Sequence, residues 1–156
     1  MAATLPAMVQ VHVARQISFK KYEFLLLKRS AAQKEFPSIW QVITGKKKEG
    51  ETFTQCAIRE IFEETNLVPA EMWALPFVAT FYLPQTDSIH HSPVFGVLVD
   101  PLKSVAISPE HEEFAWVTEQ EAFKRLAMPS HREGTAIFLK EILLKEDQEI
   151  FKIQSF

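Results

Sequence analysis

Cysteine is nearly absent from this sequence, with Cys56 alone among 156 residues. A single cysteine cannot form a disulfide within the chain, which is compatible with a reducing compartment such as the cytoplasm. No stretch reaches the roughly 18 apolar residues of a membrane-spanning helix, and residues 1–8 lack the basic start and long apolar run of a secretory signal. We therefore expect a cytoplasmic protein with no membrane partner.

An excess of positive charge is also absent. The chain has 17 lysines and arginines against 20 aspartates and glutamates, for a formal net charge of -3. Broad, non-specific nucleic-acid binding needs a basic face, so we expect no stable nucleic-acid partner. A small phosphorylated ligand stays compatible with this balance, because a bound metal ion can invert the local charge.

Several motifs of other enzyme classes are missing. The sequence has no G-x4-G-K-[ST] phosphate-binding loop and no G-x-S-x-G nucleophile turn. The histidines do not show zinc-ligand spacing, so His90 and His91 are expected in a solvated loop between two strands. Cys56 is interpreted as a packing residue, because no activating group accompanies it in the sequence.

The residues that are present suit one globular domain over 1–156, with 47% hydrophobic and 24% charged residues. Alternating or β-branched runs predict strands at 8–15, 22–28, 40–44, 77–83, 94–99 and 114–117. Helical spacing predicts helices at 52–65, 119–126 and 135–145, the last with Ile137, Ile142 and Leu144 in the core. This order predicts an α/β or α+β sandwich with helices packed on a mixed sheet.

The helix predicted at 52–65 carries the strongest chemical signal. Residues three and four apart are neighbours on a helix, so Glu60 lies beside both Glu63 and Glu64. Like-charge pairs of this kind cost roughly 0.2–0.5 kcal/mol each. A divalent cation such as Mg²⁺ would remove the repulsion, because it prefers oxygen ligands. A solvated helix face, with Arg59 and Glu63 as an ordinary ion pair, would explain the same residues.

Segment 45–67, GKKKEGETFTQCAIREIFEETNL, resembles the Nudix box, G-x5-E-x7-R-E-U-x-E-E-x-G-U, where U is bulky and aliphatic. The residues in register are Gly45, Glu51, Arg59, Glu60, Ile61, Glu63, Glu64 and Leu67. Asn66 stands where the family usually has glycine. Asparagine is the next-best residue for a left-handed helix cap, so the turn can be kept.

The flanking segments extend the resemblance over most of the chain. The stretches LLLKRS and WQVITG, which lead into the box, look like the Nudix subgroup that hydrolyses dihydroneopterin triphosphate and deoxynucleoside triphosphates. The stretch EHEEFAWVT at 110–118 is similar to a late segment in which a glutamate reaches the active site. That pattern implies Glu110, with Glu112 and Glu113 as competitors.

The resemblance implies an α/β fold, the Nudix-type α/β/α sandwich with a mixed central sheet. It also implies a pyrophosphohydrolase that uses Mg²⁺, or alternatively Mn²⁺, as cofactor. The implied metal ligands are Glu60, Glu63, Glu64, the carbonyl of Gly45 and, as a further candidate, Glu110. The metal would neutralise phosphate charge and lower the pKa of a bound water.

The remaining roles are also implied by the resemblance. Either Glu60 or Glu110 would act as the base, and Arg59 would orient a glutamate, with Glu51 the candidate, through a charge-assisted hydrogen bond. The candidate substrate-binding residues are Trp40, Arg29, Lys28 and Lys46. A core position for Trp40 and a solvated strand end for Arg29 and Lys28 are the alternatives.

The implied substrate is a small nucleotide-like molecule, with a nucleoside triphosphate cut to release pyrophosphate. Hydrolysis of a dinucleoside polyphosphate or a nucleotide sugar is the alternative within the enzyme class. A non-catalytic nucleotide-binding module is a further alternative, which the complete set of box carboxylates disfavours. Sequence spacing alone does not separate the candidate substrates, because their bases would be read by side chains from several loops.

Overall fold

The computed structural model describes residues 8–156. The N-terminal residues 1–7, on which the expectation about a secretory signal mainly rests, lie outside this range. Within the described range, no helix is both long and apolar enough to cross a membrane.

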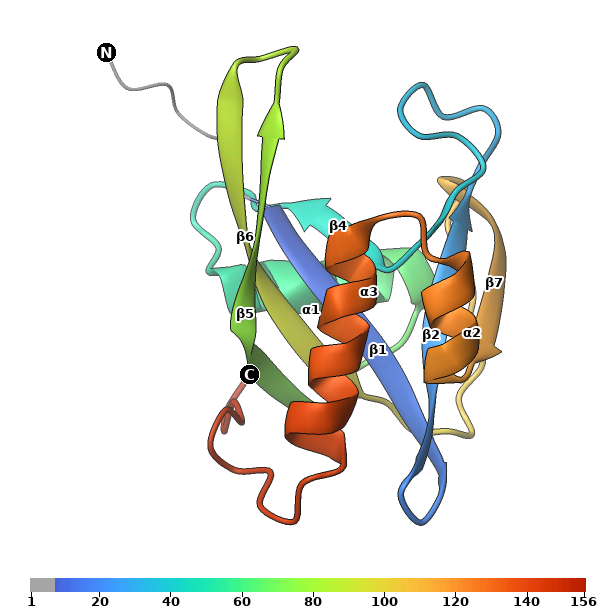
Figure 1. The fold of residues 1–156 in the computed structure, drawn as a ribbon, viewed down its shortest axis with the longest axis vertical. Coiled ribbons are helices and arrows are strands. Elements are labelled where there is room, and N and C mark those ends of the chain that lie inside the picture. Colours follow the sequence, from blue (N-terminus) through green and yellow to red (C-terminus); the bar gives the residue numbers. More distant parts are fainter. Residues whose placement is uncertain (1–7) are drawn as a thin grey trace.

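Residues 8–156 contain seven strands that form one mixed sheet (Figure 1). The strands are β1 (Met8–Ser18), β2 (Lys21–Arg29), β3 (Trp40–Gln41), β4 (Ile43–Lys46), β5 (Glu71–Leu83), β6 (Ser88–Leu98) and β7 (His111–Val117). The main order is β3-β2-β1-β6-β5, with β7 also pairing with β2 and β4 with β1. The β1–β6 pair is parallel, and the other pairs are antiparallel.

Strand β1 organises the region around the box, because two strands share its edge opposite β6. The first half of β1, from Met8 to Val11, pairs with β4, whereas the second half, from Ala14, pairs with β2. The β4 register places Gly45 opposite Val9. Gly45 therefore lies on the strand next to β1, just before the loop that leads into helix α1 (Phe53–Thr65).

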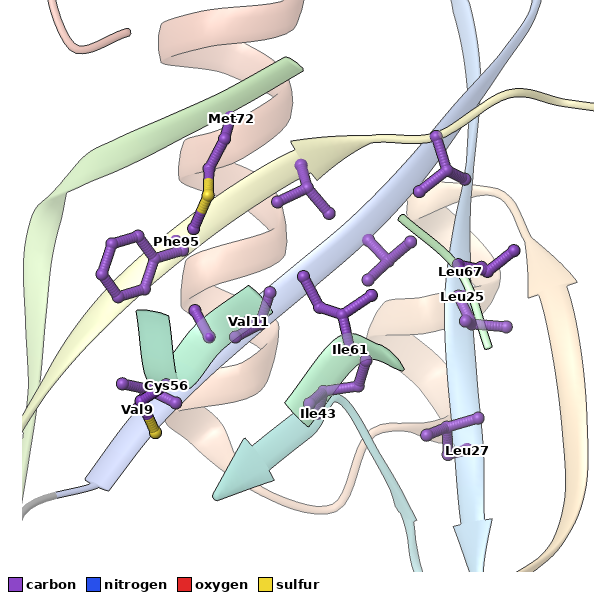
Figure 2. Packing of buried hydrophobic residues seen from close by; sticks show 14 residues of the cluster. Val9, Val11, Leu25, Leu27, Ile43, Cys56, Ile61, Leu67, Met72 and Phe95 are labelled. Atoms are coloured by element: carbon purple, nitrogen blue, oxygen red, sulfur yellow. The ribbon is translucent and has the colours of Figure 1, made fainter. Parts of the chain in front are cut away.

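Helices cover both faces of the sheet (Figure 1). Helix α1 (Phe53–Thr65) lies on one face, and α2 (Glu119–Arg125), α3 (Pro129–Ile137) and the π-helical turn η1 (Phe138–Leu143) lie on the other. Figure 2 shows Val9, Val11 and Ile61 among the apolar side chains buried between α1 and the sheet. Trp73 and Phe138 belong to a second buried cluster under α3 and η1. The predicted α/β/α sandwich with a mixed sheet is therefore confirmed.

Both ends of α1 are fixed by local hydrogen bonds. At the N-terminus, the Thr52 hydroxyl accepts from Gln55 N and the Gln55 side chain accepts from Thr52 N, which is a capping box. At the C-terminus, Asn66 adopts the left-handed conformation with φ of 62°, and its N–H donates to Phe62 O. The expectation that asparagine can replace the usual glycine at this cap is confirmed.

Two strand predictions were too short, and one loop prediction was wrong. Strands β5 and β6 begin well before the predicted segments 77–83 and 94–99. His90 and His91 lie on β6 and not in a solvated loop, and the buried His90 ring stacks on Phe81 with centroids 4.9 Å apart. The buried face of this part of β6 carries Ser88, His90 and Ser92, so it lacks the apolar alternation by which strands are recognised.

The box entry and the last helix also differ from expectation. The predicted strand 40–44 is split into β3 and β4, and β4 continues through Gly45 to Lys46. The predicted helix 135–145 starts earlier as α3 and widens into η1. Leu144, expected in the core, is 38% exposed, whereas Ile142 is buried as predicted together with Leu143. A π-turn has more residues than an α-turn, so it rotates the buried face away from 3.6-residue spacing.

Candidate active site

Arg59 connects helix α1, the box helix, to the loop that precedes it between β4 and α1, the box loop. Its Nε lies 3.0 Å from Glu51 Oε2 and its Nη2 lies 2.6 Å from Glu51 Oε1, which makes a two-pronged ion pair. Nη2 also donates to the carbonyl of Lys46 at 2.9 Å. The hydrogen bonds from Arg59 and from the Lys48 backbone N–H lower the pKa of Glu51 to about 2. Glu51 is therefore an ionised anchor for Arg59, and its oxygens are already engaged in the loop.

The same guanidinium also reaches the helix carboxylates. Nη1 lies 2.9 Å from Glu60 Oε1 and 3.1 Å from Glu63 Oε2. One positive charge thus faces three carboxylates, counting Glu51. Burial raises the pKa of Glu60, and the nearby charges of Glu63 and Glu64 raise it further, against the opposing hydrogen bond from Arg59. Repulsion from Glu63 and Glu64 is therefore present at Glu60, where Arg59 opposes it and burial is the main cause of the raised pKa.

Glu64 faces away from Arg59, toward the segment that precedes β7. Ser108 Oγ donates to Glu64 Oε2 at 2.8 Å, and His111 Nδ1 lies 2.8 Å from the same oxygen. Burial disfavours the charged form of Glu64, but these contacts outweigh it and lower its pKa. Desolvation first, and the charge of Glu64 second, raise the pKa of Glu110. The structure thus brings Glu110 next to Glu64.

The two competing glutamates of this segment point elsewhere. Glu112 lies 3.6 Å from Lys28 Nζ, and Glu113 is exposed on β7, opposite Lys28 in the strand register. Neither contacts the box helix through an ion pair or hydrogen bond of the described residues. The geometry therefore favours Glu110 among the three.

Gly45 is required by the position of Glu60. A Cβ atom built on Gly45 would overlap the carboxyl group of Glu60, so this side chain lies directly across the glycine backbone. Gly50 differs, because its φ of +84° needs glycine for conformational reasons while the space around it is open. Gly45 on β4 and Gly50 in the following loop thus serve separate purposes.

Gly45→Ala is expected to reduce the turnover rate about 100-fold, because a displacement near 1 Å at a reacting centre has roughly that effect. The backbone of Gly45 tolerates alanine, so the loss would come from the displaced Glu60. Gly50→Ala is the matched control and should cost about 1–2 kcal/mol of stability with a much smaller effect on rate. Steady-state kinetics and thermal unfolding of both variants test this. Near-parental turnover in Gly45→Ala would contradict the assigned position of Glu60.

The carboxylate set suits a divalent cation in its chemistry. Glu60, Glu63, Glu64 and Glu110 offer hard oxygen donors of the kind that Mg²⁺ and Mn²⁺ prefer. Within residues 8–156, however, no three acidic, histidine or cysteine side chains are already arranged as a metal site. Arg59 contacts the carboxylates of Glu60 and Glu63 instead. Ser108 and His111 both contact the carboxylate of Glu64. Cation binding would have to exchange part of these protein contacts for metal contacts.

The candidate substrate-binding residues are only partly gathered at the carboxylates. Arg29 is close enough for its charge to lower the pKa of Glu110, although its side chain donates to Glu35 O at 3.0 Å. Lys28 pairs with Glu112, and Lys46 is exposed at the end of β4. Trp40 packs against a buried cluster that includes Ala122 of α2 and Leu126, and the Arg125 guanidinium lies 5.3 Å from its ring centroid. Trp40 therefore lies beside α2 and not against the box helix.

Two polar residues near the carboxylates were not recognised as such in the sequence. Ser108 and His111 flank Glu110 and both contact Glu64. Spacing gave no signal for them, because they meet α1 only through the tertiary fold. A histidine directly after the loop glutamate was the one available hint.

Comparison with known proteins identifies the family. Residues 9–138 match the model of the NUDIX domain. The chain therefore belongs to the Nudix family, which is an enzyme family. Members of this family typically use a divalent metal.

Individual relatives do not narrow the substrate. The fold is similar to an Ap4A hydrolase of C. elegans (TM-score 0.71, 21% identity, covering 86% of this chain and 95% of that one). It is equally similar to the E. coli dihydroneopterin triphosphate pyrophosphohydrolase (TM-score 0.70, 21% identity, covering 86% and 95%). Both likenesses show the fold alone. The two subgroups are therefore not separated by similarity of structure.

A sequence relative is similar over part of its length only. An octanoyltransferase of Myxococcus xanthus is 36% identical over 97 residues, which are 60% of this chain and 27% of that protein. The chain thus spans about a quarter of the length of this curated relative.

Proposed function

We propose that this chain hydrolyses a nucleoside triphosphate or a closely related triphosphate to the monophosphate and pyrophosphate. In this proposal Glu60, Glu63, Glu64 and Glu110 hold Mg²⁺ or Mn²⁺, with the carbonyl of Gly45 as an additional oxygen. The observation that carries the proposal is the excess of negative charge at α1 and the loop before it, where one guanidinium faces three carboxylates. Such a cluster is costly unless a cation completes it.

The cation, when bound, supplies charge stabilisation for the phosphate oxygens and lowers the pKa of a coordinated water. The protein supplies the base. A carboxylate whose pKa is raised holds a proton more readily, which suits Glu60 and Glu110 to accept one from the attacking water. Glu60 Oε1 is engaged by Arg59, whereas Glu110 forms no ion pair among the described residues, which favours Glu110.

In this proposal, exposed lysines that precede α1 bind the leaving pyrophosphate. Lys46, at the end of β4, and Lys48, in the loop that Arg59 and Glu51 anchor, are both exposed, so their ammonium groups are free to approach phosphate oxygens. We assign them to the pyrophosphate part of the substrate. Arg29, whose positive charge favours the ionised form of Glu110, is assigned to the phosphate nearest the nucleoside.

Phosphorus NMR of the reaction products tests the proposal. A nucleoside triphosphate and dihydroneopterin triphosphate should each yield pyrophosphate and a monophosphate, and ¹⁸O-water should locate the attacked phosphorus. Dinucleoside polyphosphates and nucleotide sugars complete the panel. Orthophosphate as the sole early product, or a strong preference for a dinucleoside polyphosphate, would replace this function by the alternative. The Glu63→Gln protein, purified in parallel, controls for contaminating phosphatases.

A further inference from the structure

His111, the first residue of β7, is buried between the box helix and β3. Its exposed fraction is 6%, and its two contact residues Gln41 and Glu64 are 6% and 5% exposed. His111 Nε2 lies 2.9 Å from the side-chain nitrogen of Gln41, and Nδ1 lies 2.8 Å from Glu64 Oε2. The imidazole therefore bridges β3 and the last turn of α1.

The contact with Gln41 selects the form of the imidazole. An amide nitrogen donates and does not accept, so Nε2 must be the unprotonated nitrogen that receives this hydrogen bond. The proton of the neutral ring is then on Nδ1, facing Glu64. Nδ1 approaches Glu64 Oε2 at 2.8 Å, but the contact lacks hydrogen-bond geometry, and Nδ1 has no hydrogen-bond partner among residues 8–156.

Ser108 and His111 approach the same oxygen of Glu64, the first as a hydrogen-bond donor and the second at ion-pair distance. Ser108 Oγ and His111 Nδ1 each lie 2.8 Å from Oε2, which leaves Oε1 as the oxygen able to face a cation. A glutamate side chain has three rotatable bonds, and a hydrogen bond from Ser108 together with the close approach of His111 restricts them. Partners that orient a metal ligand in this way typically change metal affinity 10- to 100-fold when removed.

We propose that His111 is a positioning residue that, oriented by Gln41, holds the Glu64 carboxylate for divalent-cation binding. The inference rests on the proposed function, in which Glu64 is a metal ligand. It assigns His111 no contact with substrate. Its effect passes through Glu64 alone, so removal of Glu64 must remove it.

Mn²⁺ binding in the absence of substrate tests the proposal, with free Mn²⁺ measured by electron paramagnetic resonance. His111→Asn places an amide nitrogen near the position of Nδ1, whereas His111→Gln places its amide near Nε2. We expect His111→Asn to bind Mn²⁺ within a few-fold of the parent and His111→Gln to bind about 10- to 100-fold more weakly. Without metal, the two variants should have similar melting temperatures. Equal Mn²⁺ affinities for the two variants would overturn the proposal.

A double-mutant cycle and a second histidine provide the controls. In a Glu64→Gln background, His111→Gln should have no further effect on Mn²⁺ affinity, whereas additive losses would overturn the proposal. His12→Gln alters a histidine that is 1% exposed and lies on the α3 side of the sheet, bonded to Gln10 and Thr135. It should lower the melting temperature and leave Mn²⁺ affinity unchanged.

The outcome separates this inference from the proposed function. A parent protein that binds Mn²⁺ but hydrolyses no triphosphate would refute the function while the comparison of His111 variants remained decisive. A parent that hydrolyses triphosphates, with Mn²⁺ affinity insensitive to His111→Gln, would refute the positioning role alone. A parent that binds no Mn²⁺ would refute both.

Discussion

Chelation of divalent cations is expected to abolish triphosphate hydrolysis by this chain. Glu60, Glu63 and Glu64 share one end of α1, and Glu110 adds a fourth carboxylate beside Glu64. Without a cation this cluster repels an anionic triphosphate instead of binding it. Dialysis against excess chelator, followed by a hydrolysis assay, tests the expectation. Full turnover after removal of bound metal would contradict the proposed site.

Nucleotides bind Mg²⁺ themselves, so the protein site needs a readout without substrate. Addition of Mn²⁺ to the metal-free protein should raise the free energy of unfolding, by about 2.7 kcal/mol when Mn²⁺ is 100-fold above its dissociation constant. The shift should disappear in Glu60→Gln. Monovalent salt at the same ionic strength is the control, because it screens the like charges without coordinating them.

The box helix was predictable because its signals are local. Thr52, Gln55 and Asn66 define both ends through contacts within four residues, and the buried face of α1 follows helical spacing. The positions of Gly45 and Arg59 follow from the same short segment, in which β4 feeds into the loop and the helix returns beside it. Residues that interact through sequence-near geometry leave a readable pattern.

The parts that the sequence did not predict depend on contacts distant along the chain. His111 meets Glu64 only because β7 pairs with β2 and thus crosses near α1. His90 is buried on a strand whose inward face is polar, so no apolar alternation marks it. Trp40 was expected either at the ligand or in the core, and its packing against α2 comes from a bridge between Trp40 and Leu126 that sequence spacing does not reveal.

The placement of charge explains how α1 can be a stable helix although its glutamates repel one another. Its apolar side contributes Ala57 and Ile61 to the buried layer, which stabilises the helix by packing. Its polar side carries the glutamates, which repel one another and of which Glu60 and Glu63 share the single charge of Arg59. Packing energy of several kcal/mol can therefore tolerate repulsions of a few tenths each. The glutamate cluster is tolerated in this fold because the opposite face of the same helix is well buried.

Glu63→Gln should separate catalysis from folding. Glu63 is the most exposed of the three helix glutamates, with 47% of its side chain accessible, and its ion pair with Arg59 spans 3.1 Å. An exposed pair of this kind stabilises by at most about 1 kcal/mol. Loss of the repulsion with Glu60 and Glu64 offsets part of that. We therefore expect the melting temperature to change by no more than roughly 2–4 °C.

The turnover rate of Glu63→Gln should fall roughly 1,000-fold, because a lost metal ligand removes several kcal/mol of charge stabilisation from the transition state. Glu121→Gln is the matched control. Glu121 is also a helical glutamate with an accessible side chain (40%), paired with Arg125 at i,i+4 and 2.8 Å, but it lies on α2. Its substitution should leave turnover at the parental level. Near-parental turnover in Glu63→Gln would exclude Glu63 as a ligand, and an unfolded variant would show that Arg59–Glu63 is a structural pair.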